Sequence, residues 1–447
     1  MGARIAESEL YAHLWGTDEL RAIFDERARL QSWLDILAAL ARAQATLGII
    51  PPESAEAITK AADVELLDLA FVAEETRRTS HSTLGLIHGL QQVLPAPASE
   101  HVYLGATVQD VTDTWAAVAL REVGRVVWRD LRATEGLVVD LAERHRDTVM
   151  VGRTHGQPGA PITFGFKAAS WADELRRHLD RLQEGRPRWL VAQLGGAVGV
   201  LGFFGAAGPA LRSAFCAELG LSDPGISWLT SRDRLAEFAH VLAMVCGTLA
   251  RIGNEVLELQ RPEIGELREP TTGDAVGSIT MPHKRNPERS EHLDTLARLV
   301  RANAGVLLEG MVQIHERDGR GWKAEWVALP EVCLLTGVAL RTAIGLLSGL
   351  EVDVDRMAAN VGSTAGSERV LATLSARLGK HEAQARMHRA LQPGADRPAA
   401  LDESGLLDAG ELADVLASPA IEGAQAMVDE VVARSRAARL VEADRWA

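Results

Sequence analysis

Apolar residues recur every three or four positions over long parts of this chain, and this spacing places side chains on one face of an α-helix. The longest unbroken pattern begins at Thr107 and ends near His145, and a helix of that length would span roughly 55 Å. No alternating run with hairpin turns competes with the helical patterns. The sequence therefore predicts an all-α chain built on a bundle of long helices. Comparable patterns cover 18–47, 162–185, 229–261, 287–316 and 326–349.

The amino-terminal part is predicted to hold shorter helices. Asp18 can cap the first one, Gly48 ends it, and another helix follows from about Glu53. We expect three helical domains, covering residues 1–106, 107–350 and 351–447. Because one chain cannot cover every apolar stripe on helices this long, we also expect a homotetramer. Its central multi-helix core would be completed by other subunits, and its active sites would be shared between them.

Composition and charge narrow the possible partners. The chain has 447 residues, of which 47% are hydrophobic, and its net charge is −14 with no basic tract. Nucleic acid and anionic membranes are therefore not expected partners, and no apolar run approaches the length of a membrane span. Three cysteines in apolar surroundings indicate reduced core residues of a cytoplasmic protein. The sequence has neither zinc-site spacing nor a nucleotide-binding glycine motif, so we expect no metal and no cofactor.

The segment from residue 271 to 287 carries the most distinctive chemistry. It holds Ser278, Lys284 and Asn286, and Asn286 followed by Pro287 is typical of an N-cap and a first helical residue. A helix N-terminus attracts anions, and Lys284 is one of only five lysines among 47 basic residues. The segment could thus bind a small anion through a hydroxyl, an ammonium, an amide and a helix end. The alternative is a capped helix after a surface loop with ordinary charges.

Two polar blocks at helix starts could also carry chemistry. The first, residues 103–114, contains Tyr103, Thr107 and Gln109 just before and within the start of the longest helix. Thr107 could equally be a simple helix cap. Upstream of this block, His81 interrupts a helical pattern, and it could be a capped-helix histidine without chemistry.

The second block, residues 152–165, is rich in glycine and proline. These residues are expected to keep it out of regular structure until about Thr163, so that a rigid loop presents Thr154 and His155. A histidine held in a stiff turn beside a threonine is a candidate for acid–base chemistry.

Taken as a string, residues 277–287 resemble the signature loop of the aspartase/fumarase superfamily, whose common form is Gly-Ser-Ser-x-Met-Pro-x-Lys-x-Asn-Pro. The run His-Lys-Arg-Asn-Pro is similar to that of adenylosuccinate lyases and 3-carboxy-cis,cis-muconate cycloisomerases. Residues 103–110 resemble the cycloisomerase form His-Trp-Gly-Ala-Thr-Ser-Gln-Asp, and residues 152–165 resemble the Thr-His block of the superfamily. The resemblance covers nearly the whole chain.

The resemblance implies a reaction and a role for each matched residue. Ser278 would abstract a proton from a carbon next to a carboxylate, and His155 would assist the leaving group or a second carboxylate. The implied product is fumarate, released from a small substituted succinate by anti β-elimination with carbon–nitrogen cleavage, in the manner of nitrosuccinate lyase. The implied substrate-binding residues are Thr107, Thr154, Lys284, Asn286, His81, Tyr103 and Gln109.

Departures from the family pattern indicate a divergent, secondary-metabolic member. The phosphate-binding run of adenylosuccinate lyases is not visible, so a nucleotide is not the expected substrate. The first alternative is 3-carboxy-cis,cis-muconate cycloisomerase itself. The second, of another class, is a catalytically inactive structural relative akin to the crystallins that share this fold. The departing residues are Tyr103, Val108, Ile279 and Lys323.

Overall fold

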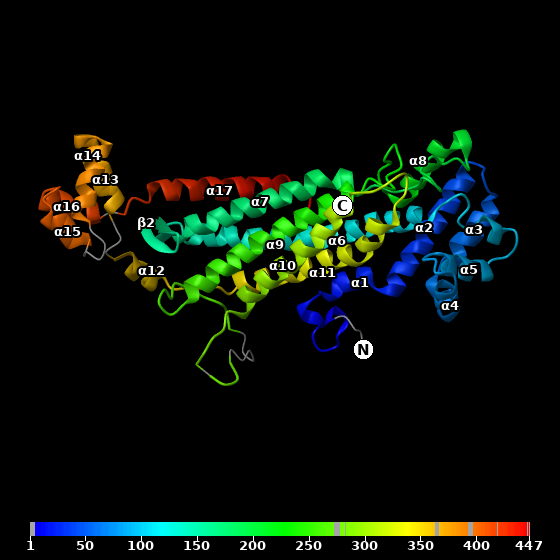
Figure 1. Ribbon diagram of the computed structural model, residues 1–447, viewed down its shortest axis with the longest axis horizontal. Helices are drawn as coiled ribbons and strands as arrows, with labels where there is room; N and C mark the ends of the chain where they lie inside the picture. The colour runs from blue at the N-terminus through cyan, green and yellow to red at the C-terminus, as the bar shows by residue number, and fades with distance from the viewer. Residues whose placement is uncertain are drawn as a thin grey trace.

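The computed structural model describes residues 5–271, 278–281, 283–362, 366–391, 397–417, 419–444 and 446. The molecule is an elongated bundle of helices, with smaller helical groups at its two ends (Figure 1). This arrangement confirms the predicted all-α class. The long helices of the bundle are α6 (Val108–Arg144), α7 (Phe164–Trp189), α9 (Asp233–Gln260), α10 (Glu288–Glu309) and α11 (Gly319–Leu347).

The amino-terminal helices gather at the end of the bundle where α6 begins. The pattern over 18–47 predicted one helix, but the chain breaks at Asp25, whose carboxylate accepts the N–H groups of Arg27 and Ala28 and so starts a second helix. The helical spacing of apolar residues continues across this break, so the sequence pattern alone does not reveal that there are two helices. The helices here are α1 (Asp18–Phe24), α2 (Glu26–Thr46), α3 (Pro52–Ala61), α4 (Leu69–Thr79) and α5 (Leu84–Gln92), with α8 (Gly208–Leu219) packed on α2.

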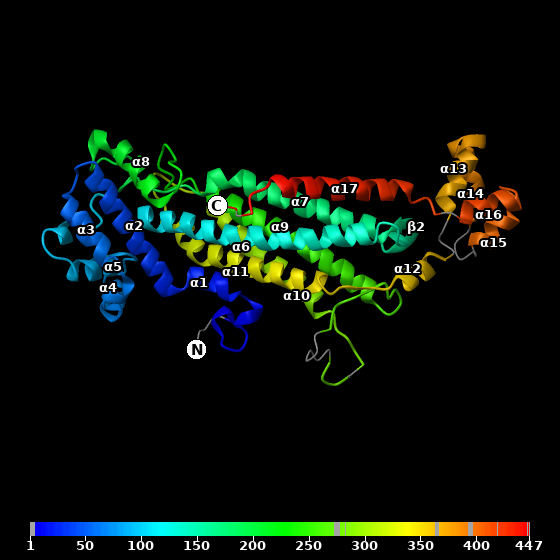
Figure 2. The same cartoon turned by 180° about the vertical axis from the view of Figure 1, so that it is seen from behind.

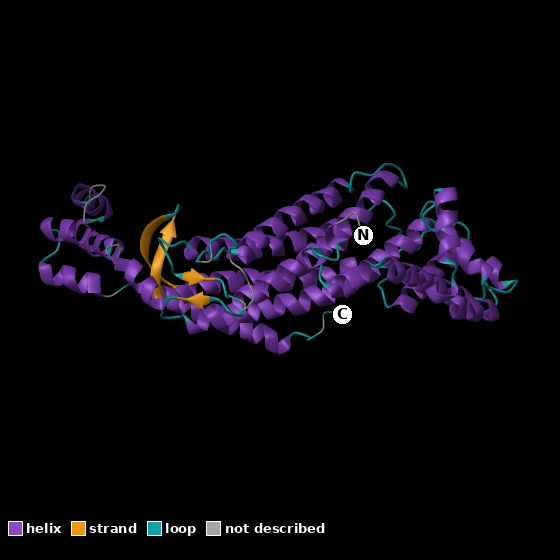
Figure 3. Ribbon diagram, turned by 90° about the horizontal axis from the view of Figure 1, so that it is seen from below, coloured by secondary structure: helices purple, strands orange, loops and turns teal. Residues whose placement is uncertain are grey.

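A β-hairpin lies at the opposite end of α6, where we expected a segment without regular structure. Strands β1 (Val149–Thr154) and β2 (Gln157–Thr163) pair antiparallel, and His155 and Gly156 form the turn with φ values of 52° and 74°. Positive φ at both positions is typical of a two-residue hairpin turn. The prediction that no hairpin competes with the helices was therefore wrong at this place. A second short pair, β3 (Leu267–Arg268) with β4 (Glu351–Val352), lies at the same end (Figure 3).

The carboxy-terminal helices form a small group that projects beyond the hairpin (Figure 2). They have an apolar core of their own, to which Val370, Leu374 and Met387 contribute. The helix that follows them, α17 (Glu422–Val441), returns to the bundle and packs along α6 and α7. The projecting group comprises α13 (Ser367–Leu378), α14 (Lys380–Ala390), α15 (Arg397–Glu403) and α16 (Ala409–Ala417), and α12 (Val354–Val361) leads into it.

Beyond α17, the side chain of Trp446 fills a slot between the helices of the bundle. It is 1% exposed, and its indole N–H donates to the carbonyl of Leu182 at 3.0 Å. A Cβ atom added at Gly124 would lie 2.0 Å from its ring. Gly124 therefore makes the space on α6 that Trp446 occupies.

Helices α9 and α11 are apolar and long enough to pass a simple test for membrane-spanning segments, contrary to our reading of the sequence. In each, 72% of the most apolar window is buried inside the molecule. Burial in the core of the bundle accounts for this composition.

Candidate active site

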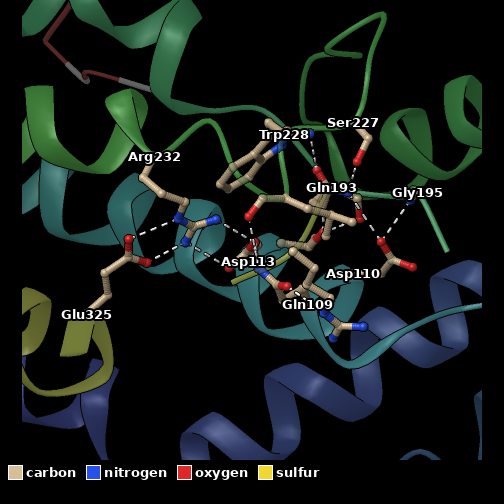
Figure 4. Close-up of polar contacts among 12 residues, drawn as sticks. Gln109, Asp110, Asp113, Gln193, Gly195, Ser227, Trp228, Arg232 and Glu325 are labelled. Carbon is tan, nitrogen blue, oxygen red and sulfur yellow. Dashed lines mark hydrogen bonds and ion pairs between the residues drawn. The ribbon is translucent and has the colours of Figure 1, made fainter. Parts of the chain in front are cut away.

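Thr107 and Asp110 shape the start of α6. Thr107 is the N-cap residue, and the carboxylate of Asp110 accepts its backbone N–H at 2.8 Å. The same carboxylate accepts the N–H groups of Gly195 at 2.8 Å and Gly196 at 3.0 Å (Figure 4). Asp110 therefore fastens the loop after α7 to the first turn of α6. Thr107 is therefore a helix cap, which is the alternative that the sequence left open. Its hydroxyl also accepts a hydrogen bond from Arg317.

Burial alters the titration of two groups in this region. It raises the pKa of Asp110 to about 7, against the opposing effect of the N–H donors that surround the carboxylate. The pKa of Tyr103 is raised to about 12, first by burial and then by the nearby negative charge of Asp110. The phenol of Tyr103 therefore stays protonated at neutral pH and can act as a hydrogen-bond donor.

Arg317, which the sequence analysis did not identify, is a half-buried cation of this region. It lies between α10 and α11, and it donates to the hydroxyl of Thr107 at 2.6 Å and to the side-chain carbonyl of Gln109 at 2.7 Å. Within the part of the chain that the structure describes, no carboxylate forms an ion pair with it. A half-buried guanidinium whose described partners are neutral has no counter-ion there and can bind an anion.

A buried ion cluster supports the next turn of α6. Arg232 lies between Asp113 and Glu325, and it donates to Asp113 at 2.7 and 3.1 Å and to Glu325 at 2.9 Å (Figure 4). Burial raises the pKa of Glu325, and the guanidinium of Arg232 opposes this shift. The cluster joins α6, the start of α9 and α11, so it holds the elements that carry Thr107 and Arg317 in place.

The hairpin presents Thr154 and His155 at its exposed tip. Thr154 ends strand β1 and His155 is the first residue of the hairpin turn, so a hairpin presents these residues where a loop without regular structure was predicted. Neither side chain contacts Ser278 by a hydrogen bond within the described residues.

The loop before α10 is partly described, since Gly277 and Pro282 of its signature string lie outside the described residues. The hydroxyl of Ser278 accepts the N–H of Met281 at 3.0 Å. Lys284 is exposed, and the amide of Asn286 donates to Glu288 at 3.3 Å. The three side chains are thus presented by one surface loop, as the sequence indicated.

The start of α10 differs from its prediction. The helix begins at Glu288, with Pro287 at the N-cap position, so Asn286 is not the cap. The carboxylate of Glu269 accepts the free N–H groups of Arg289 at 3.1 Å and Ser290 at 2.7 Å. The anion-binding end of this helix is therefore occupied by the protein's own carboxylate, so an anion at this loop would have to be bound by the exposed side chains of Lys284 and its neighbour Arg285.

These candidate residues fall into two groups at opposite ends of the bundle. Tyr103, Thr107 and Gln109 lie where α6 begins, and exposed His81 lies in the segment between α4 and α5 at that same end (Figure 1). The hairpin tip and the loop before α10 lie toward the other end, where α6 and α9 finish. The 37 residues of α6 separate the ends by roughly 55 Å. A single chain therefore does not bring the two groups together.

Comparison with known proteins identifies the family. Residues 15–302 match a lyase family. The chain is 39% identical to N-acetyl-S-(2-succino)cysteine lyase of Dickeya dadantii, over 86% of this chain and 85% of that one. It is 39% identical to 3-carboxy-cis,cis-muconate cycloisomerase of Pseudomonas aeruginosa, over 97% and 98%. The chain belongs to this lyase family, within the aspartase/fumarase superfamily.

One solved structure and one further sequence relative agree with this membership of the lyase family. The 3-carboxy-cis,cis-muconate lactonizing enzyme of Pseudomonas putida has a TM-score of 0.86 at 36% identity, and 96% of this chain and 99% of that one are covered. Adenylosuccinate lyase of Methanocaldococcus jannaschii is a further relative, 38% identical over 81% of this chain and 80% of that one. The resemblance read from the sequence is thereby confirmed. Within the described residues, this lyase has no group of three or more His, Cys, Asp or Glu side chains placed to hold a metal ion.

Proposed function

We propose that this lyase catalyses β-elimination from a small substituted succinate and releases fumarate. The observation that carries the proposal is the guanidinium of Arg317, which binds Thr107 and Gln109 at the start of α6 and has no carboxylate partner among the described residues. In a protein with a net charge of −14, a half-buried cation of this kind suits a carboxylate of a small anionic substrate.

In the proposed elimination, each of the other candidate residues has a role. Ser278, as its alkoxide, takes the proton from the carbon next to the substrate carboxylate, and Lys284 stabilises the negative charge that develops on that carboxylate. The electron pair of the C–H bond forms the carbon–carbon double bond while the leaving group departs with its bonding pair. His155 supplies the proton that the leaving group needs. Thr107 and Thr154 hold the two carboxylates.

We propose that the leaving group is bound through nitrogen, as the resemblance implies, and that a sulfur-linked group is the second candidate. The names of two relatives support a succinate derivative as substrate, one being an adenylosuccinate lyase and the other an S-(2-succino)cysteine lyase. Leaving-group discrimination would rest on the departures from the family pattern near the site, among which Tyr103 presents a protonated phenol.

We also propose that each active site draws on more than one subunit of a homotetramer. Its support is the separation of the two groups of candidate residues along α6. A reaction that needs both Thr107 and Ser278 requires a second copy of the chain to bring its hairpin and loop to the start of α6.

A second candidate function is cycloisomerisation of 3-carboxy-cis,cis-muconate. The observation in its favour is coverage, since the cycloisomerase relative matches nearly the full chain, including the carboxy-terminal helices. An inactive structural relative is disfavoured by the presence of Ser278, Lys284 and His155 in one chain.

One assay separates these functions. Purified protein is incubated with N-linked and S-linked succinates while fumarate is followed by absorbance, and separately with 3-carboxy-cis,cis-muconate while its loss is followed. Fumarate release that disappears in Ser278→Ala supports the elimination. Turnover of the muconate alone supports the second function, and no turnover of any compound contradicts both.

A further inference from the structure

Two buried carboxylates flank the short strand β3, between the end of α9 and the loop before α10. Glu266 is 0% exposed and Glu269 is 7% exposed. Neither belongs to the residues that would contact a substrate. Buried carboxylates are costly unless they are well paired, so their partners show what they hold in place.

Glu266 holds the hairpin. Its two carboxylate oxygens accept hydrogen bonds from the guanidinium of Arg153 on β1, at 2.7 and 2.9 Å. One of these oxygens also accepts the amide N–H of Asn360 on α12 at 2.8 Å. Arg153 directly precedes Thr154 and His155, so this fork fixes the strand that presents both residues.

Glu269 binds the backbone at the point where the loop ends and α10 begins. Its carboxylate binds the first free N–H groups of that helix, and its own backbone N–H donates to the side-chain carbonyl of Gln260 at 2.7 Å. The amide of Gln260 in turn donates to the carbonyl of Arg285 at 3.2 Å. Arg285 lies between Lys284 and Asn286, so both ends of this connection fix the backbone that carries those two side chains.

We propose that Glu266 and Glu269 are positioning residues of the active site, the first for Thr154 and His155 at the hairpin tip and the second for Lys284 and Asn286. This assignment rests on the proposed function. Residues 266–269, between α9 and the loop, then set two active-site elements relative to one another within a subunit. Small misplacements of catalytic groups cost large factors in rate, so removal of either carboxylate should lower turnover more than it lowers binding.

The experiment uses three single variants of the full chain, Glu266→Gln, Glu269→Gln and Glu135→Gln. An amide has the same shape as the carboxylate but replaces one acceptor oxygen with a donor, so one hydrogen bond to Arg153 or to the helix N–H groups is lost, while the backbone link from residue 269 to Gln260 remains. Glu135 is the matched control, because it is also 0% exposed and pairs with a buried arginine, Arg176, away from both active-site elements.

Hydrogen–deuterium exchange tests the positioning without any substrate. In Glu266→Gln, amides of residues 149–163 should exchange about tenfold faster or more while those of 284–290 stay unchanged, and Glu269→Gln should show the reverse. Glu135→Gln should change neither segment. Unchanged exchange in the predicted segments, or equal changes in the control, overturns the proposal whatever reaction the enzyme catalyses.

Steady-state kinetics tests the catalytic consequence on the compound that the activity assay identifies. We expect kcat to fall by about tenfold or more in Glu266→Gln and Glu269→Gln, with KM changed far less, and Glu135→Gln to keep wild-type kcat. If Ser278→Ala is inactive while both Gln variants keep wild-type kcat, the positioning role is refuted and the proposed function stands. Should Glu266→Gln fail to fold, Arg153→Lys replaces it, since lysine keeps the charge but cannot form the fork.

Discussion

Arg317 and Thr107 lie 210 positions apart in the sequence, and the guanidinium of Arg317 donates a hydrogen bond of 2.6 Å to the hydroxyl of Thr107. The contact brings a positive charge to the N-terminus of α6, which itself favours an anion. Among the described residues, donors of Arg317 that are not used by Thr107 or Gln109 remain for a ligand. This pair is the basis of the first prediction.

Replacement of Arg317 by methionine should lower kcat/KM by roughly 10²-fold, because a charge-assisted contact to a substrate carboxylate would be lost. Arg320→Met is the control, since that guanidinium pairs with Asp318 and its side chain is largely exposed. Steady-state kinetics of both variants decides the matter. Equal losses in the two would show that Arg317 has no special role.

Ser278→Ala should leave the fold and the oligomeric state intact and should lower kcat by about 10³-fold or more, as expected for loss of the group that takes the proton. The hydroxyl makes one described hydrogen bond, to the N–H of Met281, so the stability cost should be small. Thr280→Ala, an exposed hydroxyl in the same loop, is the control. Near wild-type turnover in Ser278→Ala would exclude this residue as the base.

Lys284→Met should reduce kcat/KM by roughly 10²-fold, because Glu269 already occupies the helix end and Lys284 is the group assigned to the carboxylate charge that develops in the reaction. Lys284→Arg should restore little, since a planar fork does not replace a compact ammonium. Lys380→Met, on α14, is the matched control. A wild-type rate in Lys284→Met would remove the anion site from this loop.

Shared active sites predict complementation between inactive variants. Arg317→Met alters the group at the start of α6, and Ser278→Ala alters the group at the other end of the bundle. If each site takes these residues from different subunits, reassembly of an equal mixture should leave about a quarter of the sites intact. Recovered activity after denaturation and refolding of the mixture measures this. Activity no higher than that of either variant alone would place each site within one subunit.

Stability should fall in acid through His178. This residue is 3% exposed between α7 and α9, where it contacts the hydroxyl of Thr248 at 2.8 Å, and burial and then the charge of Arg181 lower its pKa to about 4. The unfolded chain binds a proton near pH 6.5, so this contribution to stability is complete above that pH and is lost as pH falls toward 4.

Chemical denaturation of wild type and His178→Gln between pH 7 and 4 tests this dependence. The wild type should lose about 3 kcal/mol of unfolding free energy through this residue, and the variant should lack that part of the slope. His381→Gln, which alters an exposed histidine on α14, should keep the full pH dependence. Parallel curves for wild type and His178→Gln would contradict the assignment.

The sequence predicted the long helices because their hydrophobic period is strong and local. It did not predict the hairpin, since glycines and prolines obscure the alternation of its strands and the left-handed backbone of His155 leaves no mark in the sequence. The role of Glu269 at the start of α10 was equally invisible, because this cap comes from a residue outside the helix. Arg317 was missed for the same reason, since no spacing rule relates residues so far apart.

The candidate residues themselves were found by their chemistry, but their relative placement was not. Local motifs identify Thr107, His155 and Ser278 one at a time, whereas the distance between the ends of α6 decides which of them can meet within a chain. Such distances depend on the packing of whole helices, and a motif does not encode them.

The slot that Gly124 leaves for Trp446 bears on the order of biogenesis. Residues of α6 and α7 are synthesised in the first half of the chain, yet the space between them is filled by a side chain that emerges from the ribosome more than 250 residues after Leu182. The bundle of a nascent chain therefore keeps an open seam until translation has passed Trp446. A product truncated before Trp446 would expose an apolar gap in the bundle that quality-control proteases can recognise.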